Sequence, residues 1–192
     1  MSGAAATVDE ILAACRSMEG LPYDGEPVDQ LQHALQCAWL AQSEGGDDAF
    51  VVACLLHDVA RAPAVADIPY DGPDEHHGAE SARWLAPRVG ARIAWLAEQH
   101  VPAKRYLVTT DPDYATQLSE VSARTLRAQG GTMSPDEIER FRRSADWEDA
   151  VLLRRIDDRG KVVGLGVPGL ESYRARLLRV VEAAGEAEAH AP

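Results

Sequence analysis

The sequence predicts an all-α fold, and three observations support this prediction. Apolar side chains recur at helical spacing near the N-terminus, at Val8, Ile11 and Cys15. A second segment, residues 49–59, is apolar on nearly every side and therefore predicts a central helix. The sequence shows no convincing alternation of apolar and polar residues of the kind that is typical of a half-buried strand.

Start and stop signals place the helices in order. Pro27 suits the first turn of a helix over residues 28–43, which follows a loop rich in Gly and Pro. The doublet Asp47-Asp48 offers an N-cap for the apolar helix. The run Ser134-Pro135-Asp136-Glu137 combines an N-cap serine, a first-turn proline and a glutamate at N3, which is a strong helix start. The predicted helices lie at residues 8–18, 28–43, 49–59, 76–85, 91–100, 114–127, 135–143, 147–157 and 170–184, with a loop over residues 60–75.

The composition is that of one soluble globular domain. The chain has 192 residues, of which 46% are hydrophobic and 26% are charged. We expect a single domain over residues 1–184 and a disordered tail over residues 185–192. The net charge of -12 argues against nucleic-acid binding, which needs a basic face. A small anionic substrate remains compatible with this charge, because a local cluster of Lys and Arg can override the global sign.

The cysteines and the N-terminus predict a cytoplasmic location. Cys15, Cys37 and Cys54 lie in apolar helical contexts without CxxC spacing, as buried thiols in a reducing compartment do. The first residues carry acidic groups and no basic region, unlike a secretory signal. Uncharged runs are all too short to span a membrane. The oligomeric state is left open.

Histidines and aspartates stand on or at the ends of apolar helical segments, where a charge is costly unless it is paired or bound to a metal. Imidazoles together with carboxylates suit iron, manganese or zinc. An aspartate beside a histidine can give one oxygen to each of two ions, so the doublet His57-Asp58 fits a two-metal site. The candidate ligands found in this way are His33, His57, Asp58, His100 and Asp157, together with one of His76 and His77.

Each candidate also has a structural alternative. A single histidine on an apolar helix is more often a hydrogen-bonded core residue. Asp157 could simply pair with Arg154 or Arg155 on its own helix. Four such groups on four separate helices make these alternatives, taken jointly, much weaker than a metal site.

The order of these residues resembles that of a known superfamily. A histidine, a histidine-aspartate doublet and a later aspartate, here His33, His57-Asp58 and Asp157, are typical of HD-domain metal-dependent phosphohydrolases. Longer stretches resemble a narrower branch, the HD-domain mixed-valent diiron oxygenases, which cleave the C–P bond of 1-hydroxyphosphonates and are distant relatives of myo-inositol oxygenase. The resemblance extends over residues 21–173. It is carried by YDGEPVDQLQHALQCA (23–38), HVPAKRYL (100–107), LSEVSARTLRAQGGTMS (118–134) and RRIDDRGK (154–161).

The resemblance implies an HD-domain helical bundle with a buried site for two iron ions, Fe(II)/Fe(III). His77 is preferred to His76 because its spacing to Ala82 and Leu85 fits the family pattern H-x4-A-x2-L better. One iron would be held by His33, His57, Asp58 and Asp157, and Asp58 would bridge to a second iron held by His77 and His100.

The resemblance also assigns residues around the metals. Tyr23 matches a tyrosine that occupies the second iron until substrate displaces it, and Glu26 matches its partner. Arg61 departs from the superfamily, which often has a histidine there; a guanidinium can bind a phosphonate bidentately, or it can mark another acidic substrate such as a carboxylate. Positions that match contacts to the phosphonate are Lys104, Ser122, Thr125 and Gln129, although the last three could also form a solvated polar stripe.

The implied activity is an O2-dependent cleavage of the C–P bond of a small 1-hydroxyphosphonate to a carboxylate and phosphate. Three alternatives stay open at this point. A divalent-metal phosphohydrolase of nucleotides or other phosphate esters needs only the histidine and aspartate core. A diiron oxygenase of a related 2-hydroxy acid or polyol would use the same metals. A non-catalytic helical protein with core histidines would hold none.

Overall fold

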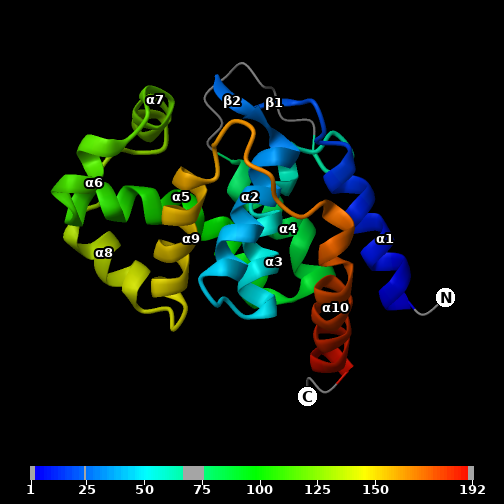
Figure 1. Ribbon diagram of the computed structural model, residues 1–192. Coiled ribbons are helices and arrows are strands. Elements are labelled where there is room, and N and C mark those ends of the chain that lie inside the picture. The colour runs from blue at the N-terminus through cyan, green and yellow to red at the C-terminus, as the bar shows by residue number, and fades with distance from the viewer. Residues whose placement is uncertain (1–2, 24, 67–75, 190–192) are drawn as a thin grey trace.

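The computed structural model describes residues 3–23, 25–66 and 76–189, and most of these residues are helical, as predicted (Figure 1). Residues 67–75 of the expected loop lie outside this description. In chain order the elements are α1 (Gly3–Arg16), β1 (Pro22–Tyr23), β2 (Glu26–Asp29), α2 (Gln30–Ser43), α3 (Asp48–Leu56), η1 (Val59–Arg61), α4 (His77–Val89), α5 (Ala91–Thr110), α6 (Pro112–Gln117), α7 (Glu120–Ala128), α8 (Pro135–Arg142), α9 (Trp147–Arg159), η2 (Leu170–Tyr173) and α10 (Arg174–Ala189).

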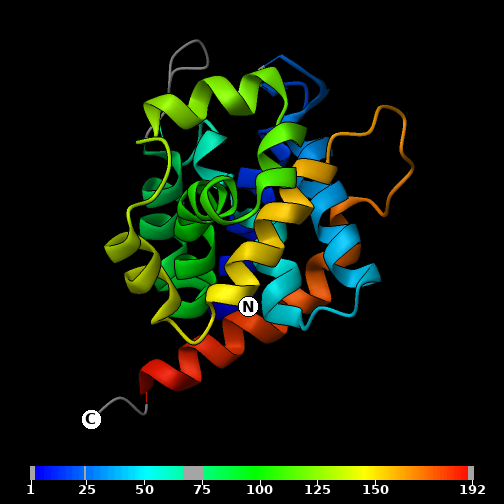
Figure 2. The same ribbon diagram turned by 90° about the vertical axis from the view of Figure 1, so that its left-hand side faces the viewer.

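Helix α3 is the centre of the bundle. It packs against α2, α5, α9 and α10, while α4 packs along α5. Helices α1 and α10 lie together on one flank, and α6, α7 and α8 lie on the opposite side beyond α5 and α9 (Figures 1 and 2). Within the described residues, every helix is too short or too polar to cross a bilayer.

The start and the end of α3 follow from its sequence. Asp47 caps the helix by accepting a hydrogen bond from the Phe50 backbone N–H at 2.7 Å. Every residue from Phe50 to Leu56 is buried, as the uniformly apolar pattern predicts. His57 follows as the C-cap, and Asp58 leads into the short helix η1. The histidine-aspartate doublet therefore stands where the most buried helix ends inside the core.

Two predicted helix boundaries, in α5 and around α6 and α7, are wrong. Helix α5 does not stop at His100 but runs through Pro102 to Thr110, because packing against α4 and α9 outweighs the backbone hydrogen bond that proline removes. The helix predicted over residues 114–127 is divided into α6 and α7. The break occurs because Leu118 is extended and Ser119 caps a new helix, accepting the Ser122 N–H at 3.1 Å.

Two further differences from the prediction lie before α2 and in α10. The loop before α2 contains the antiparallel pair β1–β2, and Pro27 lies in β2 rather than in a helix. Helix α2 starts later because Asp29 and Gln32 form a capping box that fixes its first turn. At the other end, α10 continues past residue 184 to Ala189, because the alanines and glutamates beyond Gly185 are good helix formers. Residues 185–189 are thus helical rather than disordered, and residues 190–192 lie outside the description.

Candidate metal centre

The predicted ligands converge from five parts of the fold. His33 comes from α2, the doublet His57-Asp58 from the end of α3, and His77 from the first position of α4. His100 and Asp157 come from α5 and α9. All six side chains are buried. The structure therefore brings these six side chains together rather than scattering them through the core, and their role as metal ligands stays a prediction.

Three of the ligand candidates lie together on one side of Asp58, and two of them, His33 and His57, face its Oδ2 atom. The Nε2 atoms of His33 and His57 lie 3.2 Å apart, and His33 Nε2 lies 3.4 Å from Asp157 Oδ1. Asp58 Oδ2 lies 3.5 Å from His57 Nε2 and 4.0 Å from His33 Nε2. We call His33, His57 and Asp157 the first donor group.

The other oxygen of Asp58 faces a second donor group, His77 and His100. Asp58 Oδ1 lies 3.4 Å from His77 Nε2 and 3.6 Å from His100 Nε2, and the two Nε2 atoms are 2.8 Å apart. One carboxylate therefore presents one oxygen to each group, which is the arrangement that a bridge between two metal ions requires. His76, in contrast, is the exposed N-cap of α4.

The imidazoles are oriented with a lone pair toward this centre. The Nδ1 atoms of His33, His57 and His100 each lie within hydrogen-bond distance of a backbone carbonyl, those of Gly160, Cys54 and Ala97, at 2.9, 2.9 and 2.5 Å. A neutral ring that donates from Nδ1 has only a lone pair at Nε2. Backbone carbonyls commonly orient metal-binding histidines in this way.

Electrostatics favour a cation at this centre. Burial lowers the pKa of His33 to about 4 and that of His100 to about 3, so both rings are neutral at pH 7. A neutral His33 that donates from Nδ1 therefore has no proton on Nε2 to share with His57 Nε2, 3.2 Å away. Among the described residues, Asp58 Oδ1 accepts no hydrogen bond although it is buried. Two donors bound at right angles to one ion at about 2.1 Å lie about 3 Å apart, so the observed separations fit metal binding.

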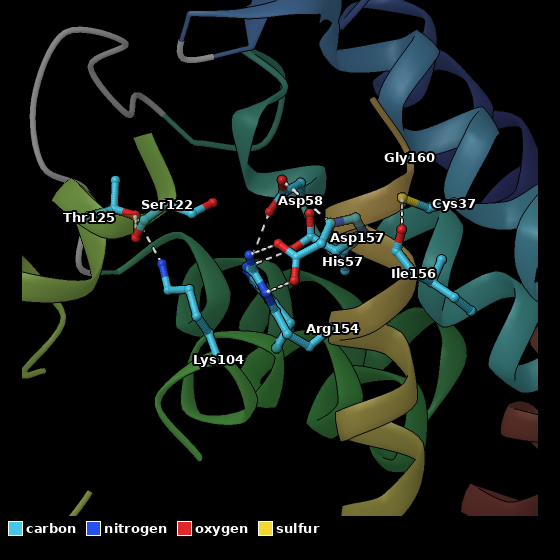
Figure 3. Close-up of polar contacts among 12 residues, drawn as sticks. Cys37, His57, Asp58, Lys104, Ser122, Thr125, Arg154, Ile156, Asp157 and Gly160 are labelled. Atoms are coloured by element: carbon cyan, nitrogen blue, oxygen red, sulfur yellow. Dashed lines mark hydrogen bonds and ion pairs between the residues drawn. The ribbon is translucent and has the colours of Figure 1, made fainter. Parts of the chain in front are cut away.

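Asp157 is held in place by a buried arginine. Arg154 Nη1 donates to Asp157 Oδ2 at 2.7 Å, while Asp157 Oδ1 stays on the side of His33 (Figure 3). The far side of the guanidinium pairs with Asp158 and donates from Nε to the Tyr114 hydroxyl at 3.0 Å. Burial opposes ionisation of Asp157, but Arg154 and Lys161 outweigh it and keep its pKa well below the usual range. Asp157 thus uses Oδ2 for its ion pair with Arg154, and its Oδ1 stays available to face a metal ion.

Cys37 supports His33 from behind. Its Sγ lies 3.7 Å from His33 Nε2 and 3.9 Å from the Ile156 carbonyl oxygen. Burial raises the pKa of this thiol well above its usual value. Its Sγ also lies close enough to the nitrogen atoms of His33 and His57 for the three residues to form a group that could hold a metal ion.

Gly160→Ala is expected to displace His33. A methyl group at Gly160 would lie 2.5 Å from Cys37 Sγ and 3.3 Å from His33 Nδ1. We expect a loss of about 1–3 kcal/mol in the free energy of unfolding, as for other overpacked cores, and a lower metal content. Urea unfolding and elemental analysis measure the two effects. Adding Cys37→Ala removes the clashing sulfur and should restore most of both losses; a double variant that recovers neither contradicts this explanation.

A cavity opens beside the second donor group. Asp58, His77 and His100 form its inner end, and its walls come from α5, α7, the end of α9 and the β1–β2 hairpin. The cavity volume is about 50 Å³, which is on the order of four water molecules. The site therefore suits a small ligand.

Tyr23 and Glu26 close the outer side of this cavity. The Tyr23 ring stacks on His33, with ring centroids 4.2 Å apart, and its hydroxyl donates to Asp157 Oδ1 at 3.2 Å. Glu26 Oε1 accepts a hydrogen bond from Ser119 Oγ at 3.0 Å and pairs with Lys161 Nζ at 3.4 Å. The hydroxyl of Tyr23 thus lies on the Asp157 side, and its expected place on the second ion stays a prediction.

The predicted substrate-binding residues share one wall. Lys104 Nζ donates to Thr125 Oγ1 at 2.9 Å, and Thr125 lies one turn after Ser122 on α7 (Figure 3). Gln129, the C-cap of α7, and Arg61, from η1, also line the cavity. The structure therefore brings all five residues together, and their role toward a substrate remains a prediction.

Two cavity residues were not identified from the sequence. Arg154 was considered only as a partner of Asp157, although its spacing to Asp157 and Asp158 was a usable signal. Lys161 gave no local signal, because its partner Glu26 lies 135 positions away in the chain.

The fold and the site together define a class: a helical protein of the HD-domain type whose buried histidines and carboxylates are suited to hold metal. No family model matches the chain. It is 37% identical over 166 residues, covering 85% of the chain and 83% of the relative, to hydroxymethylphosphonate dioxygenase of Gimesia maris. It is 32% identical over 165 residues, covering 83% of each protein, to [1-hydroxy-2-(trimethylamino)ethyl]phosphonate dioxygenase (glycine-betaine-forming) of Leisingera caerulea. An uncharacterized protein, L432, of Acanthamoeba polyphaga mimivirus is 30% identical over 171 residues, covering 87% of the chain and 78% of that protein.

These similarities extend over most of each protein and confirm the resemblance drawn from the motifs. The chain belongs to the family of oxygenases that cleave the C–P bond of 1-hydroxyphosphonates. It is therefore an oxygenase, and the phosphohydrolase and non-catalytic alternatives receive no support from the named relatives.

Proposed function

We propose that this oxygenase uses O2 and a pair of iron ions, Fe(II)/Fe(III), to convert a small 1-hydroxyphosphonate into a carboxylate and phosphate. The balanced reaction is R–CH(OH)–PO3²⁻ + O2 → R–COO⁻ + HPO4²⁻ + H⁺. The observation that carries the proposal is the Asp58 carboxylate, whose two oxygens face two separate groups of histidines beside a cation-lined cavity.

The proposed ligand sets follow the two donor groups. His33, His57 and Asp157 would hold one ion, His77 and His100 the other, and Asp58 would bridge them. When bound, the irons supply the redox chemistry with O2 that amino-acid side chains lack, and the protein supplies orientation and exclusion of water.

The chain's own residues have three proposed tasks. Lys104, oriented by Thr125 and close to Ser122, binds the phosphonate as a charged hydrogen-bond donor. Arg61, which also lines the cavity, adds a second cation, which suits a dianion. Tyr23, held by Asp157 and His33, covers the centre until the substrate's oxygen atoms take its place, and Glu26 anchors the hairpin that carries it.

The direct test is turnover of hydroxymethylphosphonate. Protein loaded anaerobically with Fe(II) and then given O2 should release one phosphate for each O2 consumed. Electron paramagnetic resonance should show the signal of a coupled Fe(II)/Fe(III) pair. Phosphate release that continues without O2, or that occurs equally from a phosphate ester, would instead support the hydrolase.

Lys104 should give the reaction an upper pH limit. Burial and the charge of Arg154 lower the pKa of Lys104 to about 7, with Asp157 and Asp158 opposing the shift and Lys161 adding to it. The ammonium form that binds an anion is therefore lost as the pH rises above about 7. We expect kcat/KM to fall up to about tenfold per pH unit above that point.

The matched variant is Lys104→Arg, whose guanidinium keeps its charge throughout this range. Its kcat/KM should stay level to higher pH, even if its absolute value is lower. If kcat/KM falls with pH in the same way in the unmodified protein and in Lys104→Arg, the titrating group is not Lys104 but another residue or the substrate.

A further inference from the structure

We infer that the Lys161 ammonium occupies the place that a cationic substrate tail would need, so that this site selects 1-hydroxyphosphonates with short, uncharged tails. The inference rests on the proposed function and deepens it by naming the substrate class. Both kinds of substrate occur among the relatives, since one is named for hydroxymethylphosphonate and another for a trimethylamino compound.

The walls of the cavity leave one region for a tail. The inner end carries the donors Asp58, His77 and His100, and the α5–α7 wall carries the groups assigned to the phosphonate. Of the remaining lining, Arg61 is assigned to the phosphonate, and Asp157 belongs to the first donor group and is paired with Arg154. The last part is formed by Tyr23, Glu26 and Lys161 with the apolar side chains of Val101 and Val121. A substituent on the hydroxyl-bearing carbon has to face this last part.

Among the described residues of this part of the lining, the groups that could attract a cation are already engaged. Quaternary ammonium groups are recognised by aromatic faces and by carboxylates. Of the described residues that line the cavity, Tyr23 is the one with a phenol ring, and that ring is stacked on His33 and has Lys161 Nζ 5.3 Å from its centroid. The carboxylate of Glu26 already pairs with Lys161 and accepts a hydrogen bond from Ser119.

The residues before and after Lys161 in the chain are both held in place by hydrogen bonds. The Gly160 carbonyl lies 2.9 Å from His33 Nδ1, and the buried side chain of Gln36 bonds both the N–H and the carbonyl of Val162, each at 2.9 Å. The lysine is thus a tethered cation. A trimethylammonium tail would have to displace it from Tyr23 and Glu26 at the same time, in a space of about 50 Å³.

The test separates charge from size with two compounds of the same shape. One is [1-hydroxy-2-(trimethylamino)ethyl]phosphonate, and the other is its uncharged analogue, 1-hydroxy-3,3-dimethylbutylphosphonate, in which carbon replaces nitrogen. Dissociation constants are measured by anaerobic calorimetry on the iron-loaded protein, with hydroxymethylphosphonate as reference. We expect the uncharged analogue to bind at least about tenfold more tightly than the charged one. This factor is smaller than the full repulsion between the Lys161 ammonium and a neighbouring trimethylammonium group would give.

Lys161→Met keeps the length of the side chain and removes its charge. The tenfold preference should shrink to about threefold or less, or reverse, because the Glu26 carboxylate is then also released. Lys161→Arg keeps the charge and should keep the preference. Circular dichroism and melting curves establish that each variant folds, and the comparison of the two compounds on the unmodified protein needs no variant.

Three results would overturn the inference, and the first two are equal binding of the charged and uncharged analogues and a preference that survives Lys161→Met unchanged. Equal rejection of both bulky compounds by all three proteins would assign the selection to size alone and likewise remove the role of Lys161. Failure of the proposed function looks different, because hydroxymethylphosphonate itself would then release no phosphate under O2.

Discussion

Asp58→Ala is expected to abolish binding of both metal ions, and turnover with it. Within the described structure, Asp58 is the only carboxylate with an oxygen facing each donor group. Its Oδ2 lies 3.5 Å from His57 Nε2, and its Oδ1 lies 3.4 Å from His77 Nε2. Without this carboxylate, the second group keeps only imidazoles, and the first group keeps one carboxylate to offset the charge of an ion. Iron per chain after anaerobic reconstitution should fall from two to well below one.

Thermal unfolding gives an independent measure of the same loss. An ion present at 100 times its dissociation constant stabilises the folded state by about 2.7 kcal/mol, or about 5–10 °C in a chain of this size. The unmodified protein should show this rise on addition of Fe(II), and Asp58→Ala should show none. Asp136→Ala, at an exposed position in α8, is the matched control and should behave as the unmodified protein does. Two irons retained in Asp58→Ala would remove the bridge from the model of the site.

Much of the fold was predictable because its signals are local. The cap at Asp47 and the capping box at Ser134 act within four residues of their helices, and both helices begin where these signals predict. Two predictions that involve positions near prolines were wrong: the helix predicted to end at His100 continues through Pro102, and Pro27, expected in the first turn of a helix, lies in β2. Whether proline ends a helix depends on the packing around it, which the sequence of one segment does not contain.

The site was predictable to the extent that its residues break the apolar pattern. A histidine or aspartate on a buried helical face stands out in the sequence, and the donors recognised in this way do converge. Arg154 lies within α9 and could have been recognised from its spacing to Asp157 and Asp158. Lys161 follows that helix, where charge is ordinary, and only its long-range contact with Glu26 reveals its position. The choice between His76 and His77 rested on motif spacing, since adjacent residues cannot be separated by helical periodicity alone.

The preference for His77 over His76 leads to the second prediction with a large expected effect. His77→Ala should remove the metal ion of the second donor group and lower phosphate release by more than about 100-fold, a loss that even the outer partners of metal ligands can cause. His77 is buried, with Nε2 at 2.8 Å from His100 Nε2 and at 3.4 Å from Asp58 Oδ1. Gly78 beside it permits this approach, because a methyl there would lie 3.1 Å from the Glu98 carbonyl oxygen and 3.5 Å from the His100 ring.

His76→Ala is the control that the chain itself provides, since it removes an identical side chain from the adjacent position. The His76 side chain is exposed at the N-cap of α4, where no side-chain capping bond forms, so this variant should keep both irons and most of its activity. Elemental analysis and phosphate release, measured on both variants after the same reconstitution, decide between the neighbours. Loss of iron from His76→Ala with retention in His77→Ala would reverse the assignment. Because the burial of His77 depends on how closely α4 and α5 approach at Gly78, that outcome would also require a different packing of these helices around the cavity.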